Sequence, residues 1–289
     1  MPEPADPEEL TTPPLSAGRR RAAPGRPADT AAIRRYYDQN TRLFLAWGQP
    51  RTYTIHRGLW APGVTSHAQA LNHSHELLLA EARFLAQRDA PARLRLADLG
   101  CGVGGSLFYL LERLAPALGV GCTLSPAQAR LAAGRRAALK LGNPCLVLEA
   151  DFHCAPLAAG FDLVYSVEAF VHAAEPARYL AEAARLLRPG GRLMLIDDFR
   201  APGAVAGADP AALRWLAAYQ AGWHVPNLRP PAEAADLAAA QGLRLVGDRD
   251  LTPLIRLRAL PEALAEILLA LGRRAPPGHA IVPSMVGSL

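Results

Sequence analysis

The chain has 289 residues, a formal net charge of +5 and a hydrophobic fraction of 51%. A chain of this length and composition buries one large core or two smaller ones, which excludes a protein that is disordered throughout. All of its basic residues except Lys140 are arginines. Together with the abundance of alanine, this indicates a coding bias more than a surface for polyanions, and we predict no nucleic-acid partner.

The first residues and the cysteines indicate the cellular compartment of the protein. The chain begins with proline and acidic residues where a secretory signal has a basic head, and it has no apolar run of about 18 residues. Cysteines without C-x-x-C spacing in apolar stretches are typical of reduced, buried thiols. They are Cys101, Cys122, Cys145 and Cys154. We expect a cytoplasmic protein with no stable membrane insertion and no disulfide or zinc framework. The sequence does not decide between a monomer and a homo-oligomer.

The first 90 residues divide into two segments. Residues 1–28 contain seven prolines and almost no large apolar side chain, so we predict a disordered tail. Residues 29–90 are predicted to form a helical lid, with one helix near 31–48 and a second from Ser66 to Gln87. One third of the aromatic residues precede the second helix: Tyr36, Tyr37, Phe44, Trp47, Tyr53 and Trp60.

Residues 91–200 alternate between short apolar segments and helical segments, which is typical of right-handed β-α-β crossovers. We therefore predict an α/β fold with a doubly wound, Rossmann-like, mostly parallel sheet. The predicted strands are 93–100, 119–125, 143–151, 161–167 and 192–199, and the helices are 106–118, 126–142 and 175–191. Residues 201–289 are predicted to be a helical insertion and the end of the sheet, with helices at 208–222 and 231–242, a strand at 243–252 and a poor terminal strand at 278–289.

The strongest motif follows the first predicted strand and reads Asp98-Leu99-Gly100-Cys101-Gly102-Val103-Gly104. Glycines at alternate positions let the backbone turn tightly and lie against a ligand. A dinucleotide site would have G-x-G-x-x-G over a pyrophosphate, whereas this spacing is G-x-G-x-G after an acidic residue. The motif favours a ligand without phosphate whose positive end lies near Asp98, and a turn with no ligand is the alternative.

The ends of the next two predicted strands give this turn a context. The second strand ends in Thr123-Leu124-Ser125, and the third ends at Asp151-Phe152. In an open parallel sheet these carboxyl ends meet at one crevice with the glycine turn. With the Arg-Pro-Gly-Gly exit at 188–191, the features resemble the class I S-adenosylmethionine-dependent methyltransferases over roughly residues 94–200. The neutral Thr-Leu-Ser, where many members have an acid, resembles the cyclopropane-synthase, sterol and small-molecule C-methylating branches.

The resemblance implies S-adenosylmethionine as the cofactor and a role for each motif. The glycine turn would surround the methionine part, and the residues after the second strand would lie near the ribose. Asp151 would accept a hydrogen bond from the adenine amine, with Phe152 against the ring. The implied cofactor-binding residues are Asp98, Gly100, Gly102, Gly104, Thr123, Ser125, Gln128, Asp151 and Phe152.

The segment from Tyr36 to Trp60, followed by Ser74-His75-Glu76, resembles the lid of sterol, tocopherol and prenyl diphosphate C-methyltransferases. Methyl transfer from a sulfonium is an in-line displacement, for which an enzyme mainly positions the acceptor and excludes water. The resemblance implies C-methylation of an isoprenoid alkene, such as isopentenyl, geranyl or farnesyl diphosphate. Sterol-type C-methylation and O- or N-methylation of an apolar natural product are the alternatives.

An alkene that attacks the methyl group becomes a carbocation, which aromatic faces stabilise by about 0.5–2 kcal/mol per ring. A base must then remove a proton. Glu168, after the fourth predicted strand, is the predicted base with His172 as its partner or substitute; a helix cap and a structural histidine are the alternatives. The candidate substrate-binding residues are Tyr36, Tyr37, Arg42, Phe44, Trp47, His56, Trp60, Phe170, Trp215, Tyr219 and Trp223. The last three share one helix face, which suits a pocket wall or a core stripe.

The lid also contains arginines that suit a diphosphate, with a solvated basic face as the alternative. They are Arg34, Arg35, Arg42, Arg51 and Arg57. For a diphosphate acceptor we expect Mg²⁺ as well, with His75 and Glu76 as weak candidates because magnesium prefers oxygen ligands. A nicotinamide-dependent oxidoreductase is disfavoured, since the G-x-x-G spacing and an acid after the second strand are both missing.

Overall fold

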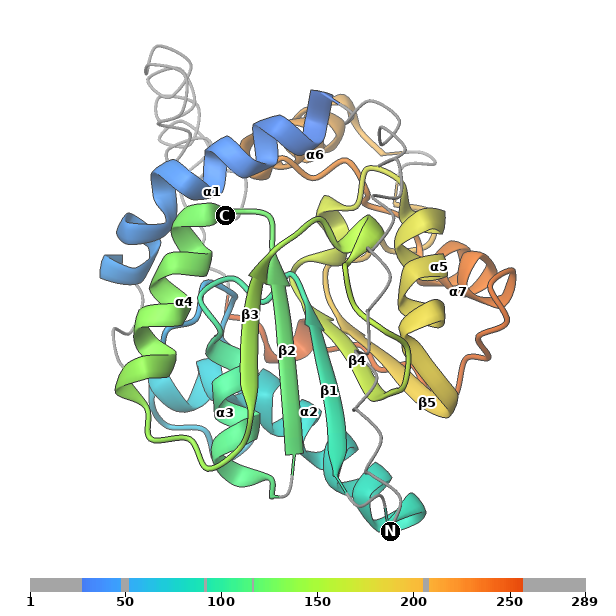
Figure 1. Ribbon diagram of the computed structural model, residues 1–289. Coiled ribbons are helices and arrows are strands. Elements are labelled where there is room, and N and C mark those ends of the chain that lie inside the picture. The colour runs from blue at the N-terminus through green and yellow to red at the C-terminus, as the bar shows by residue number, and fades with distance from the viewer. Residues whose placement is uncertain (1–27, 48–51, 91–92, 116, 205–207, 257–289) are drawn as a thin grey trace, which may run out of the picture.

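The structure is a computed structural model that describes residues 28–47, 52–90, 93–115, 117–204 and 208–256 (Figure 1). At its centre is a five-stranded sheet with the order β3-β2-β1-β4-β5, in which all neighbours are parallel. The strands are β1 (Leu94–Leu99), β2 (Ala117–Thr123), β3 (Cys145–Glu149), β4 (Phe161–Val167) and β5 (Leu187–Ile196). The predicted α/β, Rossmann-like sheet is confirmed. The direction of winding changes between β1 and β4, which is where open α/β sheets bind ligands.

Alternate side chains of the strands build one apolar core on each face of the sheet. On one face, Leu94 and Leu96 of β1 belong to a core shared with the helices α2 (His67–Asp89), α3 (Gly105–Arg113) and α4 (Pro126–Ala138). On the other face, Ala97 and Leu99 belong to a core shared with α5 (Pro176–Leu186) and α7 (Pro231–Ala239). The sheet is therefore covered on both sides, as its nearly continuous apolar strands predict.

Two further helices, α1 (Ala28–Trp47) and α6 (Pro210–Trp223), lie across one end of the sheet, at the top of Figure 1. They contact each other through the rings of Phe44 and Trp223, which stack with centroids 5.9 Å apart. Short 3-10 helices follow the strands at Phe152–Cys154 and Phe170–His172, and another spans Thr252–Leu254. The helical N-terminal segment is thus present, and it covers the carboxyl ends of the strands.

Local capping explains where two predicted helices begin. Ser66 and Gln69 form a capping box at the start of α2, in which each side chain accepts a hydrogen bond from the backbone of the other residue. Ser125 caps α4 by accepting a hydrogen bond from the backbone N–H of Gln128, and Pro126 occupies the first turn.

Several predicted boundaries are wrong. The helix predicted at 106–118 ends at Arg113, because Pro116 cannot continue it and Ala117 already pairs with Leu94 in the sheet. The helix predicted at 126–142 ends at Ala138, where Leu139 turns to an extended conformation. The helix predicted within 175–191 ends at Leu186. Its predicted exit at 188–191 belongs to β5, which starts at Leu187 and not at 192, because Leu187 already pairs with Phe161.

The strand predicted at 243–252 is also wrong. Its adjacent residues Leu245 and Val246 are 63% and 60% exposed, and no strand of the described residues lies beside them. An isolated bridge between Leu59 and Ile255 joins the following segment to the lid. Cys154 is exposed, against the expectation of four buried thiols, because it ends a 3-10 helix on the surface. The predicted tail and terminal strand lie outside the described residues, apart from Ala28.

Within the part of the chain that the structure describes, no helix combines the length and the apolarity needed to cross a membrane.

Candidate active site

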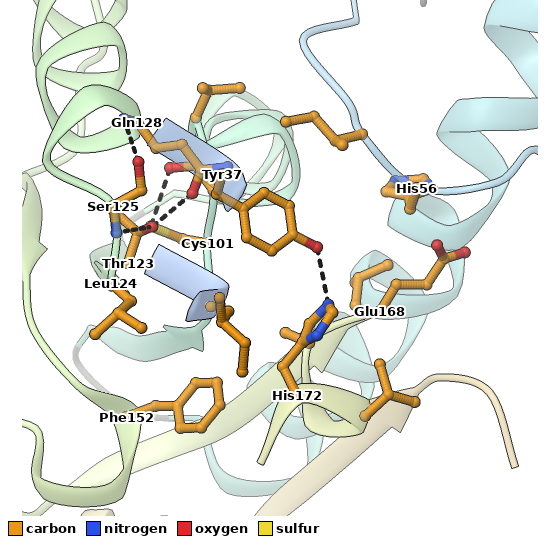
Figure 2. Close-up of a pocket in the computed structure, with 18 of the residues that line it drawn as sticks. Tyr37, His56, Cys101, Thr123, Leu124, Ser125, Gln128, Phe152, Glu168 and His172 are labelled. Atoms are coloured by element: carbon orange, nitrogen blue, oxygen red, sulfur yellow. Dashed lines mark hydrogen bonds between the residues drawn. The ribbon is translucent and has the colours of Figure 1, made fainter. Parts of the chain in front are cut away.

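A cavity of about 250 Å³ lies where strands β1, β2 and β4 end and where the chain leaves β3 (Figure 2). The glycine turn and the residues that follow β2, β3 and β4 line one side of it. Helix α1, the loop at residues 53–57 and helix α6 line the other side. The cavity therefore joins the core of the sheet to the two helical segments outside it, at the change of winding direction.

The glycine turn presents bare backbone to this cavity. Gly100 and Gly102 line it, and Gly100 has a φ of +96°. A Cβ at Gly100 would come within 2.4 Å of the Cβ of Ala169, so the position needs glycine. Gly104 does not line the cavity; a Cβ there would lie 2.5 Å from the ring of Phe108. Two of the three motif glycines thus lie at the cavity, and the third allows α3 to pack closely.

Asp98 is a buried carboxyl group at the wall of the cavity. It is 3% exposed, and it forms no salt bridge with any described residue. Burial raises the pKa of Asp98 to about 8. A cationic ligand group would favour its ionised form. Asp98 and the bare turn therefore fit the positively charged methionine part of the cofactor that the resemblance implies.

The polar residues after β2 hold one another and the lid. Thr123 Oγ1 donates to Gln128 Oε1 at 2.7 Å, and the backbone N–H of Gln128 donates to Ser125 Oγ at 3.1 Å. Ser125 Oγ donates in turn to Asp38 Oδ1 of α1 at 2.5 Å, and the backbone N–H of Ala127 donates to the same oxygen at 3.1 Å. The three predicted ribose residues are thus brought together at the cavity, and the lid helix binds one of them, Ser125.

Asp151 and Phe152 line the cavity at the end of β3. The backbone N–H and Nδ1 of His153 lie 2.9 and 2.8 Å from Asp151 Oδ1. Burial alone would raise the pKa of Asp151, but these hydrogen bonds lower it below its ordinary value. The Phe152 ring meets Tyr179 edge-on, with centroids 5.1 Å apart.

Glu168, the predicted base, follows β4 with a φ of +46°. Its Oε1 accepts a hydrogen bond from the backbone N–H of Arg57 at 2.9 Å and lies 3.6 Å from Arg57 Nε. Arg57 also pairs with Asp198, which accepts a hydrogen bond from the Tyr219 hydroxyl. Burial lowers the pKa of Arg57, but both carboxylates together raise it above its ordinary value. One ionic cluster therefore joins the lid loop, the ends of β4 and β5, and α6.

His172 lies beside this cluster and binds the lid as well. Its Nε2 is 2.8 Å from the hydroxyl of Tyr37 (Figure 2). Its Nδ1 is 3.0 Å from the carbonyl oxygen of His224. Because a carbonyl only accepts, Nδ1 carries the ring proton and Nε2 accepts from Tyr37. Burial lowers the pKa of His172 to about 4, so the ring is neutral at pH 7.

The predicted aromatic residues divide into cavity residues and packing residues. Tyr37, His56, Tyr219 and Trp223 line the cavity. The predicted face of α6 thus contributes two of its three rings, and Trp215 lies away from the cavity beside Arg214.

The other candidates support these rings or lie elsewhere. Tyr36 and Phe44 pack against Tyr37 with edge-on rings. Phe170 is buried against Tyr179 and Phe199. Trp60 stacks on His67, and Arg42 is exposed. The side chain of Trp47 lies outside the described residues.

The arginines of the lid do not gather at one point. Arg34 and Arg57 line the cavity, and each is paired with carboxylates; Arg34 lies 3.0 Å from Glu149. Arg35 is exposed, and Arg51 is outside the described residues.

His75 and Glu76, the two weak candidates for a metal site, contact other side chains. His75 is buried with its Nε2 3.1 Å from His56 Nε2, and Glu76 accepts a hydrogen bond from Tyr109. In the described ranges, no group of three or more His, Cys, Asp or Glu side chains could hold a metal ion.

Sequence reasoning missed Asp38 and Asp198 and gave Arg57 a different role. Asp198 belongs to an acidic pair directly after the apolar residues of β5, at the edge where the other site residues lie, and this position was a usable signal. Nothing in the sequence indicates that Arg57 pairs with Glu168 and Asp198, since these contacts span 111 and 141 residues.

Comparisons with known proteins decide the family. A family model described as "Methyltransferase domain" matches residues 97–195. The dimethylglycine N-methyltransferase of Parasynechococcus marenigrum (strain WH8102) is 30% identical over 224 residues, which cover 75% of this chain and 73% of that protein. The chain belongs to the class I S-adenosylmethionine-dependent methyltransferases.

Other relatives of this methyltransferase differ in the acceptor atom that their names state. The chloroplastic tocopherol O-methyltransferase of Arabidopsis thaliana is 29% identical over 172 residues, 57% of this chain and 48% of that protein. The 24-methylenesterol C-methyltransferase 2 of Oryza sativa subsp. japonica is 29% identical over 236 residues, 81% of this chain and 60% of that protein. The chain thus spans about half the length of the first of these relatives and somewhat more of the second.

A solved structure shows the same fold over nearly the whole chain. It is the geranyl diphosphate C-methyltransferase from Streptomyces coelicolor A3(2), in complex with Mg²⁺, geranyl diphosphate and S-adenosyl-L-homocysteine. Its TM-score is 0.62 at 21% identity, covering 92% of this chain and 94% of that one. At this identity the likeness is one of fold, so the acceptor has to be argued from the cavity itself.

Proposed function

We propose that this methyltransferase transfers the methyl group to carbon, at the alkene of a small, neutral isoprenoid. The observation that carries the proposal is the charge at the acceptor end of the cavity. There the carboxylates of Glu168 and Asp198 share the single guanidinium of Arg57, which leaves the cluster with a net negative charge. Tyr219 and Trp223 add ring faces. Such surroundings stabilise a cation that develops on the acceptor.

A prenyl diphosphate fits these surroundings less well than a neutral isoprenoid. The cavity arginines Arg34 and Arg57 are already paired with carboxylates. A diphosphate would have to break these pairs and lie beside Glu168 and Asp198, so like charges would oppose its binding. We therefore rank the diphosphate esters, with the Mg²⁺ that they would need, below the neutral alkenes as candidate acceptors.

We assign each part of the bound cofactor to a different group of residues. S-Adenosylmethionine, when bound, supplies an electrophilic methyl group on a sulfonium. Asp98, Gly100 and Gly102 hold the methionine part, where the Asp98 carboxylate balances positive charge. Thr123, Ser125 and Gln128 lie at the ribose, and Asp151 and Phe152 at the adenine; all of these residues line the cavity.

We assign the removal of the final proton to Glu168. Arg57 holds its carboxylate in place through the backbone N–H and the guanidinium. His172 accepts from Tyr37 through Nε2, so its neutral ring orients the Tyr37 hydroxyl at the cavity. Helix α1, the lid loop and α6 exclude the water that would otherwise quench a carbocation.

A second candidate is methyl transfer to oxygen or nitrogen through the Tyr37–His172 pair. The hydroxyl and Nε2 are 2.8 Å apart at the cavity, so the neutral imidazole is able to take a proton that Tyr37 passes on from an acceptor O–H or N–H. The relative with 30% identity, whose name states an N-methyltransferase, supports this candidate.

Product analysis with a methyl-labelled cofactor tests both candidates. The acceptor panel pairs each prenol with its diphosphate, and adds sterols, phenols and amines. We expect label on carbon with a neutral alkene and slower turnover with its diphosphate. Label found solely on oxygen or nitrogen would replace the first candidate by the second. Absence of S-adenosylhomocysteine binding in titration calorimetry would overturn both.

A further inference from the structure

Asp151 and His153 form a hydrogen-bonded pair where the chain leaves β3. Both donors of His153, its backbone N–H at 2.9 Å and its Nδ1 at 2.8 Å, reach the same oxygen, Asp151 Oδ1. The side chains are 18% and 6% exposed. Because an ionised carboxylate only accepts hydrogen bonds, Nδ1 carries the ring proton. His153 thereby occupies one of the two carboxylate oxygens of Asp151.

The second oxygen is left for a ligand. Asp151 Oδ2 has no hydrogen-bond partner among the described residues, and Asp151 lines the cavity. The same 3-10 turn places the ring of Phe152 at the cavity, with its centroid 4.8 Å from the His153 ring. One turn therefore holds an oriented acceptor and an aromatic face next to each other.

The His153 ring also has a cost that a residue chosen only for packing would avoid. Its Nε2 is buried and has no hydrogen-bond partner among the described residues. A buried polar atom without a partner destabilises the folded protein, whereas a phenylalanine would fill similar space without this penalty. The contribution of the ring therefore comes from its Nδ1 side, where it holds Asp151.

We infer that His153 is a positioning residue for adenine recognition, an inference that rests on the proposed cofactor site. By holding Oδ1, it fixes the plane of the carboxylate so that Oδ2 accepts the exocyclic amine of the adenine that lies on Phe152. Selectivity for a base with an amine, over one with a carbonyl at the same position, thus depends on the Nδ1 hydrogen bond.

The test compares S-adenosylhomocysteine with S-inosylhomocysteine, which has a carbonyl oxygen where adenine has the amine. The readout is the dissociation constant of S-inosylhomocysteine divided by that of S-adenosylhomocysteine, both measured by titration calorimetry on the full chain. H153N keeps an amide N–H close to the position of Nδ1, and H153Q moves the amide to the position of Nε2. We expect H153Q to lower the ratio about five- to tenfold, and H153N to keep it within about twofold.

The outcomes separate this inference from the proposed function. Failure of the wild type to bind S-adenosylhomocysteine overturns the proposed function. Normal binding with an unchanged ratio in H153Q overturns the role of His153 alone, and so does an equal loss for both ligands in both variants. The thermal unfolding midpoint without ligand shows whether each variant is folded; if H153Q is not, H153F removes the same donor and is expected to lower the ratio equally.

Discussion

Two aspartates in the cavity are held in opposite states by their surroundings. Burial without a charged partner raises the pKa of Asp98 to about 8, whereas hydrogen bonds from His153 outweigh burial and lower the pKa of Asp151. In the sequence both are acids near the end of a strand. In the folded protein, a bound cation would favour the ionised form of Asp98, whereas hydrogen bonds already favour the ionised form of Asp151, which accepts them.

The raised pKa of Asp98 predicts proton release on cofactor binding. Below pH 8 the carboxyl is mostly protonated in the free protein, and the cationic part of the ligand stabilises the ionised form. Binding therefore releases a proton and becomes tighter as the pH rises toward 8, by up to about tenfold per pH unit, and then levels off. Titration calorimetry of S-adenosylhomocysteine at pH 6.5 in buffers of different ionisation enthalpy measures this release.

Asp98→Asn is the control for this measurement, since it cannot ionise and keeps a similar volume. It should bind more weakly and release about one proton less than the wild type. Equal proton release by the two proteins would show that another group titrates.

Glu168→Gln tests the assigned base. We expect kcat on the preferred alkene to fall by roughly 10²–10⁴-fold, because the amide cannot take the proton, while the affinity for S-adenosylhomocysteine stays within about twofold. The amide oxygen still accepts from the backbone N–H of Arg57, so the lid loop keeps its contact. The exposed Glu175→Gln serves as the control, and full turnover by Glu168→Gln would exclude this residue as the base.

At the scale of elements, α1 connects the lid to the cofactor side of the cavity. Asp38 binds the cap residue and the first turn of α4, and Tyr37 on the preceding position binds His172 after β4. Because both contacts come from one helical turn, α1 either meets both strand ends together or neither. The position of the lid is therefore coupled to the residues that we assign to the ribose.

Asp38→Ala should loosen this coupling. Loss of the charge-assisted hydrogen bonds to Ser125 and Ala127 is expected to weaken S-adenosylhomocysteine binding about tenfold and to speed amide hydrogen exchange in α1. The measurements are calorimetry and hydrogen exchange with mass spectrometry. The neighbouring Gln39, which is exposed, provides the control Gln39→Ala. If α1 exchanged at the wild-type rate in the Asp38 variant, the coupling would be wrong.

At the scale of the whole molecule, two cores on opposite faces of the sheet support a site that lies at the carboxyl ends of the strands. Leu163 of β4 is fully buried in one core, whereas Leu146 of β3 is 49% exposed. Leu163 itself does not line the cavity, so we expect its contribution to stability to be separable from ligand binding.

Leu163→Ala is expected to lower the free energy of unfolding by about 2–5 kcal/mol, since it leaves a cavity among packed side chains. Leu146→Ala should change it by no more than about 0.5 kcal/mol. Chemical denaturation checks both values. The folded fraction of each variant should bind S-adenosylhomocysteine as the wild type does; a large loss of affinity in folded Leu163→Ala would show that core and site are not separable.

The sequence by itself determined the features that depend on neighbouring residues. The alternation of apolar strands and helices, the glycine turn after Asp98 and the polar ends of β2 and β3 were all readable, because periodicity and turn chemistry are local. Parallel topology then brings the strand ends to one edge, so most of the predicted cofactor residues meet at the cavity. The segment 243–252 shows the limit, since we predict a strand there and the structure forms none.

Only the tertiary structure decided how the lid meets the core. The Arg57–Glu168–Asp198 cluster, the Asp38–Ser125 contact and the Tyr37–His172 pair join residues that are 87 to 141 positions apart. Which side chains of a helix meet such partners depends on how the helix is rotated and placed on the sheet, and no local pattern encodes that rotation. For this reason the sequence predicted arginines facing a diphosphate, whereas the structure pairs the described arginines of the cavity with carboxylates.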